Sequence, residues 1–246
     1  MNPLVNAVME SVAFVLLAKI GARQVGYRSW RGRRFPRAAA ALSIVVAVPS
    51  VAQMLWPAIM HALDRQPNEV LHHAQIWRLL SAVFVQDGGA IGTIFNLVSL
   101  SVIAALAEWS WGWRRMLAIF LFAGVLLNAQ AVAFNLGGAG SSGATYALGA
   151  SLAGVLVLTG SPRSRLRALA CPLFGAAMFA LGDAHGLAIL YGAVIGAVLH
   201  SYSASNGGAN RRAGKMPPDV VERANREAFP PSALFLPSGG ARSQAN

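Results

Sequence analysis

The chain has 246 residues, of which 55% are hydrophobic and only 12% are charged. Soluble domains carry about a quarter charged residues, so this composition excludes a water-soluble globular core and indicates a polytopic membrane protein. The net charge is +11, and the single cysteine, Cys171, excludes an internal disulfide.

Uninterrupted apolar runs of about 17–25 residues predict the membrane spans. The first run, at 3–22, is interrupted by Glu10 and Lys19, so it is either an extra span or an interfacial helix. Six further runs predict helices that cross the membrane: 38–62, 91–108, 115–134, 142–160, 167–182 and 185–202. The predicted fold class is an all-α polytopic membrane protein with a six-helix bundle, with or without one extra N-terminal helix.

The regions outside these six spans have a different composition. Residues 1–37 hold the N-terminal apolar run and a basic segment, and residues 38–202 form the predicted transmembrane core. Residues 203–246 are rich in Gly, Pro, Ser and Arg, which predicts a mostly disordered tail with a short helix at 218–228.

The positive charge is concentrated in four segments: 23–37, 114–115, 163–167 and 211–242. They hold 17 of the 20 lysine and arginine residues and alternate with the other connections between the predicted spans. Cytoplasmic loops carry excess Lys and Arg, so both ends of the core are expected in the cytoplasm. Nucleic-acid binding is not expected, because no aromatic residues are interleaved with the basic ones as a base-stacking surface requires. Arg outnumbers Lys and Ala is abundant, as in GC-rich genomes, so we expect a bacterial inner (plasma) membrane.

Three polar residues on three predicted spans fall at the extracytoplasmic end: Asn96, Ser142 and His185. Polar groups at membrane depth are costly and usually face the bundle interior or a wet cavity. A histidine takes and returns a proton near neutral pH, so this set predicts a serine nucleophile with a histidine base. The Ser142 N–H at its helix start and the Asn96 amide would donate to an oxyanion. The alternative for Ser142 is a helix cap or a helix–helix contact.

The faces of two predicted helices match each other. Tyr146 follows Ser142 by four residues and therefore shares its face. On the last span, Gly192 and Gly196 follow His185 as a stripe of small residues, which lets two helices approach closely. We expect the ring of Tyr146 to lie against the imidazole of His185.

Four motifs stand in order between 38 and 202. They are Trp77-Arg78, Glu108-x-x-x-Gly112 followed by Arg114, Gly140-Ser141-Ser142-Gly143 continued by Tyr146-Ala147-Leu148, and Ala184-His185 followed by Ala188 and Gly192. In sequence and spacing they resemble the signature elements of the rhomboid family of intramembrane serine proteases. The resemblance covers the whole predicted core.

The resemblance implies a role for each site residue. Ser142, directly before Gly143, would be the nucleophile and His185 the general base, with no third acidic member and therefore no part for Asp183. Asn96 would complete the oxyanion hole, and Gly140, Gly143 and Tyr146 would support the site. The implied activity is hydrolysis of peptide bonds in single-span membrane proteins, near the extracytoplasmic side. The implied partners are transmembrane substrates and the lipid bilayer, and neither a metal nor an organic cofactor is implied.

The chain also departs from the family pattern. Gly92 stands four residues before Asn96, where the family commonly has a histidine, and Gln86 stands near the place of a second one. These departures favour an alternative, a proteolytically inactive rhomboid-like protein that binds membrane clients. The pair His72-His73 has no carboxylate or cysteine at ligand spacing, so exposed loop residues are expected there rather than a metal site.

Overall fold

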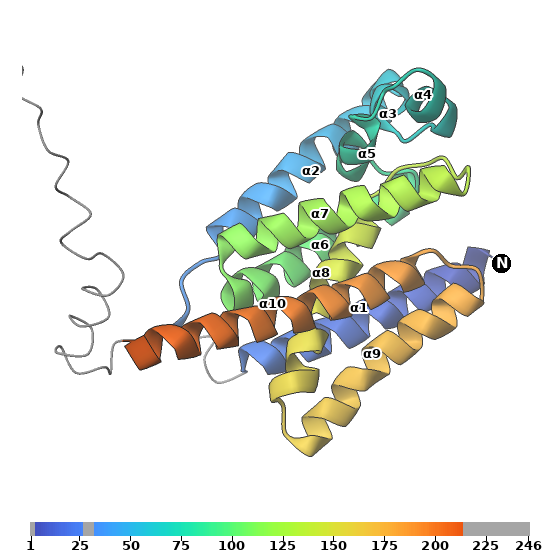
Figure 1. The fold of residues 1–246 in the computed structure, drawn as a ribbon. Helices are drawn as coiled ribbons and strands as arrows, with labels where there is room; N and C mark the ends of the chain where they lie inside the picture. The colour runs from blue at the N-terminus through green and yellow to red at the C-terminus, as the bar shows by residue number, and fades with distance from the viewer. Residues whose placement is uncertain (1–2, 27–31, 214–246) are drawn as a thin grey trace, which may run out of the picture. The chain divides into compact units, whose positions relative to one another are not determined.

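The structure, a computed structural model, describes residues 3–26 and 32–213 and is almost entirely helical (Figure 1). Its helices, in chain order, are α1 (Pro3–Val25), α2 (Arg37–Leu55), α3 (Ala58–Leu63), α4 (Pro67–His72), α5 (Arg78–Ser81), the 3₁₀ turn η2 (Ala82–Phe84), α6 (Gly89–Trp111), α7 (Trp113–Ala133), α8 (Ser142–Thr159), α9 (Pro162–Ala180) and α10 (His185–Ala213). Within the described ranges the only β-structure is one isolated bridge between Arg65 and Gly138. The predicted all-α class is confirmed.

Six of the described helices are long and apolar enough to cross a membrane, which indicates a multi-pass membrane protein. They are Leu4–Val25, Arg37–Leu55, Gly89–Trp111, Trp113–Ala133, Ser142–Thr159 and His185–Ser205. The number equals the prediction, but the members differ. The N-terminal run that the sequence left open is among the six, and the predicted span at 167–182 is not. That segment belongs to α9, whose first turns carry Arg163, Arg165 and Arg167 and are therefore poorly apolar.

Despite its charged start, α9 runs from one end of the bundle to the other, as α8 does. Two residues separate it from the end of α8, and it ends shortly before the start of α10. The starts of α8 and α10 lie at one end of the bundle, because Ser142 and His185 are hydrogen-bonded there. The 19 residues of α9 correspond to about 28 Å of helix, enough to bring the chain back across the bundle.

Helix α8 is the centre of the bundle. Every residue from Gly143 to Leu156 is buried, and the helix packs against α1, α6, α7 and α9 (Figure 1). Helix α1 shares this core, since its Ala13, Leu17 and Ile20 are buried. An interfacial position for α1 does not agree with that burial, so the N-terminal run is part of the bundle.

One predicted boundary is wrong. The first predicted span, 38–62, breaks at Trp56–Pro57 into α2 and the short α3, because a residue before proline is disfavoured in the helical region. The last predicted span, 185–202, agrees with the candidate span His185–Ser205, although α10 continues as a helix to Ala213. The predicted helix at 218–228 lies outside the described residues. The residues that build the site lie within Met1–His200, the first of two units of the chain.

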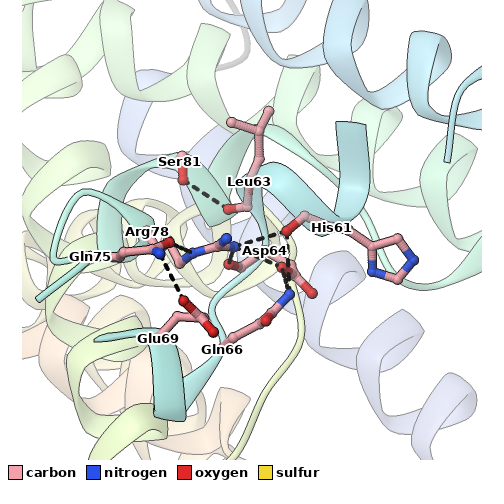
Figure 2. A network of polar contacts seen from close by, with 8 residues as sticks. All are labelled: His61, Leu63, Asp64, Gln66, Glu69, Gln75, Arg78 and Ser81. Carbon is pink, nitrogen blue, oxygen red and sulfur yellow. Dashed lines mark hydrogen bonds and ion pairs between the residues drawn. The ribbon is translucent and has the colours of Figure 1, made fainter. Parts of the chain in front are cut away.

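Arg78, of the Trp77-Arg78 motif, organises the segment between α2 and α6 (Figure 2). Arg78 is buried, and its guanidinium forms an ion pair with Asp64 at 3.1 Å. It also donates to the carbonyl of His61 at 3.0 Å and to Gln75 at 2.6 Å. The five N–H donors of a guanidinium form a fixed fork that suits this convergence of acceptors. Arg78 therefore joins α5 to α3, and to α4 through Gln75, which donates to Glu69.

The Glu108-x-x-x-Gly112 motif fixes the opposite end of the bundle. The Glu108 carboxylate accepts a hydrogen bond from the backbone N–H of Ala39 at 2.7 Å, and so satisfies a first-turn donor of α2. Gly112 separates α6 from α7 at a φ of 77°, a conformation that favours glycine. The motif therefore joins α2, α6 and α7.

Candidate active site

The candidate nucleophile, Ser142, opens α8. Gly140 before it adopts a φ of 151°, and a Cβ there would lie 3.5 Å from the Ser142 hydroxyl oxygen. A Cβ on Gly143 would overlap the side chain of Leu127 from α7. The two glycines of the motif therefore let the chain turn sharply into α8 and let α7 approach its first turn.

His185 is the first residue of α10, and its side chain contacts that of Ser142. Its Nε2 lies 2.8 Å from the Ser142 hydroxyl oxygen, a distance at which the imidazole accepts the serine proton. The structure thus brings together the two residues that the sequence predicts as nucleophile and base, which stand 43 positions apart.

A third group, the carboxylate of Asp183, contacts the other side of the imidazole. Its Oδ1 lies 2.7 Å from His185 Nδ1 and also accepts the backbone N–H of His185 at 2.9 Å. No part in the site was expected for Asp183, yet its carboxylate lies within hydrogen-bond distance of the imidazole. The two-residue spacing from His185 was the available signal, because a residue at this position caps the helix start and still reaches the ring.

The charge state of Asp183 suits this contact. Burial by itself would raise the pKa of the Asp183 carboxyl, but the hydrogen bonds and the charge of His185 outweigh burial and lower it below the ordinary value. The carboxylate is therefore ionised at neutral pH. It holds the proton of the imidazole on Nδ1, which leaves Nε2 free to accept from Ser142.

Glu10 of α1 brings a second carboxylate to the same imidazole, and sequence reasoning did not identify it as a site residue. Its Oε1 lies 3.7 Å from His185 Nδ1. The hydroxyl of Tyr146 donates to the Glu10 backbone carbonyl at 3.1 Å. In the sequence Glu10 only interrupts an apolar run, and such an intramembrane acid is itself a signal of function.

The face of α8 below Ser142 contacts α10 as the small residues predict. The Tyr146 ring lies edge-on to the His185 imidazole, with the ring centres 5.4 Å apart. A Cβ on Gly192 would overlap the backbone of Ala147, and one on Gly196 the backbone of Ser151. This close approach sets the distance between the serine and the histidine.

Asn96 lies at the predicted depth, but its side-chain amide is hydrogen-bonded to Gln86. Its Nδ2 donates to the Gln86 side-chain oxygen at 2.8 Å, and the Gln86 amide nitrogen donates to the Ser141 hydroxyl at 3.1 Å. Asn96 is thus two hydrogen bonds from Ser141 and is not seen to line the cavity at Ser142. Gln86 is 2% exposed and links α6 to the turn before α8. In the sequence, Gln86 is conspicuous only because it stands near the place of a histidine in the family pattern.

A polar cavity of about 210 Å³ opens at Ser142, and Glu10, Gly143, Ala144 and His185 also line it. The first N–H groups of a helix have no acceptor within the helix, so those of Ser142 and Gly143 are available at the start of α8. They carry the positive end of the helix dipole. These backbone N–H groups are therefore able to donate to an anionic oxygen in the cavity, the role that the sequence assigned to the Ser142 N–H together with Asn96.

Two residues from the preceding loops, Arg65 and Asp87, hold the turn before Ser142. Arg65 donates to Asn128 at 2.7 Å, and its backbone exchanges two hydrogen bonds with Gly138. Asp87 accepts the N–H of Ala139 at 2.9 Å. The turn is thus fixed from the α3–α4 segment and from the start of α6.

A second, apolar cavity of about 340 Å³ adjoins the first one. It shares Leu127, Ala131, Leu136 and Ala184 with the polar cavity. Phe134 and Phe179 add aromatic surface to it. An apolar side chain placed there would lie beside the serine.

The remaining polar residues singled out in the sequence lie elsewhere. His72 and His73 are exposed, as expected, but His72 is the last residue of α4 and only His73 follows the helix. Gly92 faces open space, since a Cβ there would meet nothing within 4 Å. A larger residue at position 92 would therefore find room on the face of α6 that carries Asn96.

Comparison of the chain with models of known protein families found no match, and a search of curated proteins found no relative.

Proposed function

We propose that the protein is an intramembrane serine protease of the rhomboid type, which hydrolyses peptide bonds of single-span membrane proteins. The observation that carries the proposal is the chain of contacts from the Ser142 hydroxyl through His185 to Asp183, at 2.8 and 2.7 Å. Nucleophile, base and an orienting third group within hydrogen-bond reach are the signature of an activated serine. The four sequence motifs agree with this assignment.

The mechanism follows from the geometry of these groups. Ser142 Oγ attacks the substrate carbonyl carbon while His185 Nε2 takes its proton, and Asp183 stabilises the imidazolium that forms. The N–H groups of Ser142 and Gly143 donate to the oxyanion. The imidazolium then gives its proton to the leaving amine, which produces an acyl-enzyme. A water molecule in the polar cavity is activated by the same imidazole and hydrolyses the ester.

The charge distribution supports an extracytoplasmic site. Among the described residues, the basic ones at 23–26, 32–37, 114–115 and 163–167 lie at helix ends opposite the start of α8, and the positive-inside rule assigns that end to the cytoplasm. In this topology α9 also crosses the membrane, together with the six candidate spans. The site then lies at the outer end of α8, in a bacterial inner membrane.

Substrates would be transmembrane proteins with an accessible peptide bond. The serine is reached through a cavity within a bundle of membrane-crossing helices, and apolar exposed residues cover the outside of α2 and α6. A substrate segment that unwinds near small residues would bring its carbonyl to Ser142. Its apolar side chains suit the adjoining cavity beside Phe134 and Phe179.

The second candidate is a client-binding protein without proteolytic turnover. Gly92 leaves the face of α6 without the histidine common in the family, and the Asn96 amide is directed to Gln86. Losing one side-chain donor from an oxyanion hole costs roughly 10²–10³ in rate. If the backbone donors do not compensate, binding remains without cleavage.

Labelling of the purified, detergent-solubilised protein with a fluorophosphonate probe tests the proposal. We expect the wild type to label, and Ser142→Ala and His185→Ala to lose labelling. The matched control is Ser141→Ala, which removes the neighbouring hydroxyl and should still label. If several probes fail on folded wild type, the client-binding function is supported, and Gly92→His is the variant to assay next.

A further inference from the structure

Two carboxylates from distant parts of the chain meet the imidazole of His185 on the side away from Ser142. Asp183 Oδ1 lies 2.7 Å from Nδ1 and Glu10 Oε1 lies 3.7 Å from it. One ligand-type atom from each of the three residues falls within 4.8 Å of the other two. Glu10 comes from α1 and the other two residues from the start of α10, so the cluster exists only in the folded bundle.

The charge of this cluster is unbalanced. Asp183 is 6% exposed, and its second oxygen, Oδ2, is buried without a hydrogen-bond partner among the described residues. Among the residues that the structure describes, neither Glu10 nor Asp183 forms an ion pair with a lysine or an arginine. Buried carboxylate oxygens are costly unless a donor or a cation meets them. The orphaned oxygen therefore points to a cationic ligand.

The donor set selects the kind of cation. One imidazole nitrogen and two carboxylate oxygens suit Zn²⁺, which binds these atoms at about 2.0–2.2 Å, whereas Mg²⁺ and Ca²⁺ prefer oxygen ligands in larger number. A tetrahedral site with such bonds separates its ligand atoms by roughly 3.4 Å, between the two distances observed here. Glu10 and His185 line the polar cavity, which gives a hydrated ion access and leaves room for water as the fourth ligand.

We propose that Glu10, Asp183 and His185 form an inhibitory binding site for Zn²⁺ or a similar divalent transition-metal ion. The metal would take Nδ1 of His185, the nitrogen that otherwise carries the proton. A neutral imidazole then holds its one proton on Nε2, which donates to the Ser142 hydroxyl instead of accepting from it. The serine loses its base while the ion is bound. This inhibitory effect rests on the proposed function, but the binding of the metal does not.

Binding is tested on the full-length Ser142→Ala protein in detergent micelles, so that no serine chemistry is required. Isothermal titration with Zn²⁺ is expected to show one site per chain. Adding Glu10→Gln should weaken that site at least about tenfold, the loss typical of removing even an outer-shell partner. Adding Glu69→Gln is the matched control, because it removes a carboxylate on α4 and should leave the affinity unchanged. An excess of Mg²⁺ should not compete.

One result would overturn the site. If Glu10→Gln and Asp183→Asn bind Zn²⁺ as tightly as their parent while His72→Ala removes the binding, the ion sits on the exposed histidines instead. Glu10→Gln is nearly isosteric, so it decides the question alone if Asp183→Asn does not fold.

The inhibitory effect is tested by the rate of fluorophosphonate labelling of the wild type. Saturating Zn²⁺ should slow labelling at least tenfold, and EDTA should restore it. Unchanged labelling at a zinc concentration that fills the titrated site would contradict inhibition. Complete absence of labelling in the wild type would count against the proposed function only, because the titration on Ser142→Ala still decides the metal site.

Discussion

The hydroxyl of Tyr146 donates a hydrogen bond to the backbone carbonyl of Glu10, 3.1 Å away, while its ring lies edge-on to the imidazole of His185. One fully buried side chain thus joins α1 to the candidate active site. Helix α1 is fastened to α8 at the depth of the serine, although the sequence marks it as the weakest of the apolar runs.

Replacing Tyr146 separates the two contacts. Tyr146→Phe keeps the ring and loses only the hydrogen bond to Glu10, so the free energy of unfolding should fall by about 0.5–1.5 kcal/mol with labelling of Ser142 retained. Tyr146→Ala also removes the ring and should cost about 3–5 kcal/mol and slow labelling. Thermal unfolding and probe labelling of the two variants check this. Equal labelling rates in both would show that the ring does not position His185.

Replacing each of the two adjacent serines is expected to affect a different property, stability for Ser141 and labelling for Ser142. Ser141 is fully buried and accepts from Gln86, so Ser141→Ala leaves a buried amide without its acceptor and should lower stability by about 1–3 kcal/mol. Ser142→Ala should change stability little and abolish labelling. Unfolding in detergent, followed for both variants, provides the comparison. A catalytic loss in Ser141→Ala at full stability would reverse the assignment.

Asp183→Asn tests the third member. The amide cannot hold the imidazole in the same tautomer, so the labelling rate should fall by roughly 10²–10⁴-fold with Ser142 and His185 in place. A loss smaller than about threefold would restore the dyad without an acidic member that the sequence analysis expected. The labelling rate of His185→Ala, measured in the same experiment, gives the rate that remains without the base.

The pH dependence distinguishes Asp183 from His185. The pKa of Asp183 is lowered from its ordinary value, near 3.9, so its carboxylate stays ionised above about pH 4 and its contribution disappears only as the pH falls through that lowered pKa. A fall in labelling rate that is already seen above this pH is therefore due to protonation of His185. In Asp183→Asn, which lacks the carboxylate that stabilises the imidazolium, the fall should move to lower pH and the absolute rates should be lower.

Glycines on two helices are expected to respond differently to an added methyl group. Gly192→Ala would force α10 away from the backbone of Ala147, which should cost about 1–3 kcal/mol and slow labelling because Ser142 and His185 separate. Gly92→Ala is the control, since a Cβ there meets open space, and the better helix former should raise stability by about 0.5–1 kcal/mol. Thermal unfolding of both variants is the measurement. A neutral Gly192→Ala would mean that the spacing of α8 and α10 has other determinants.

How far the sequence predicts the site depends on the kind of contact. Ser142, His185, Tyr146 and Gly192 lie on helix faces whose periodicity is visible in the sequence, and the structure brings these four together. Asn96 lies at the expected depth, but a rotatable amide chooses among nearby partners, and the buried Gln86 is the partner it has. The sequence pattern predicts the depth of a polar side chain in the membrane, but it does not predict that side chain's hydrogen-bond partners.

By itself, the sequence determined the helical membrane class, the segregation of the positive charge and the positions of the serine and histidine, because these follow from local composition and spacing. Only the tertiary structure decided that Asp183 and Glu10 both reach His185, and that α1 is inside the bundle. An apolar helix in a membrane has no marked polar face to show which neighbours it packs against. Those neighbours are set by shape, through small residues such as Gly192 and through single hydrogen bonds such as that of Tyr146, and shape appears only when all the helices are assembled.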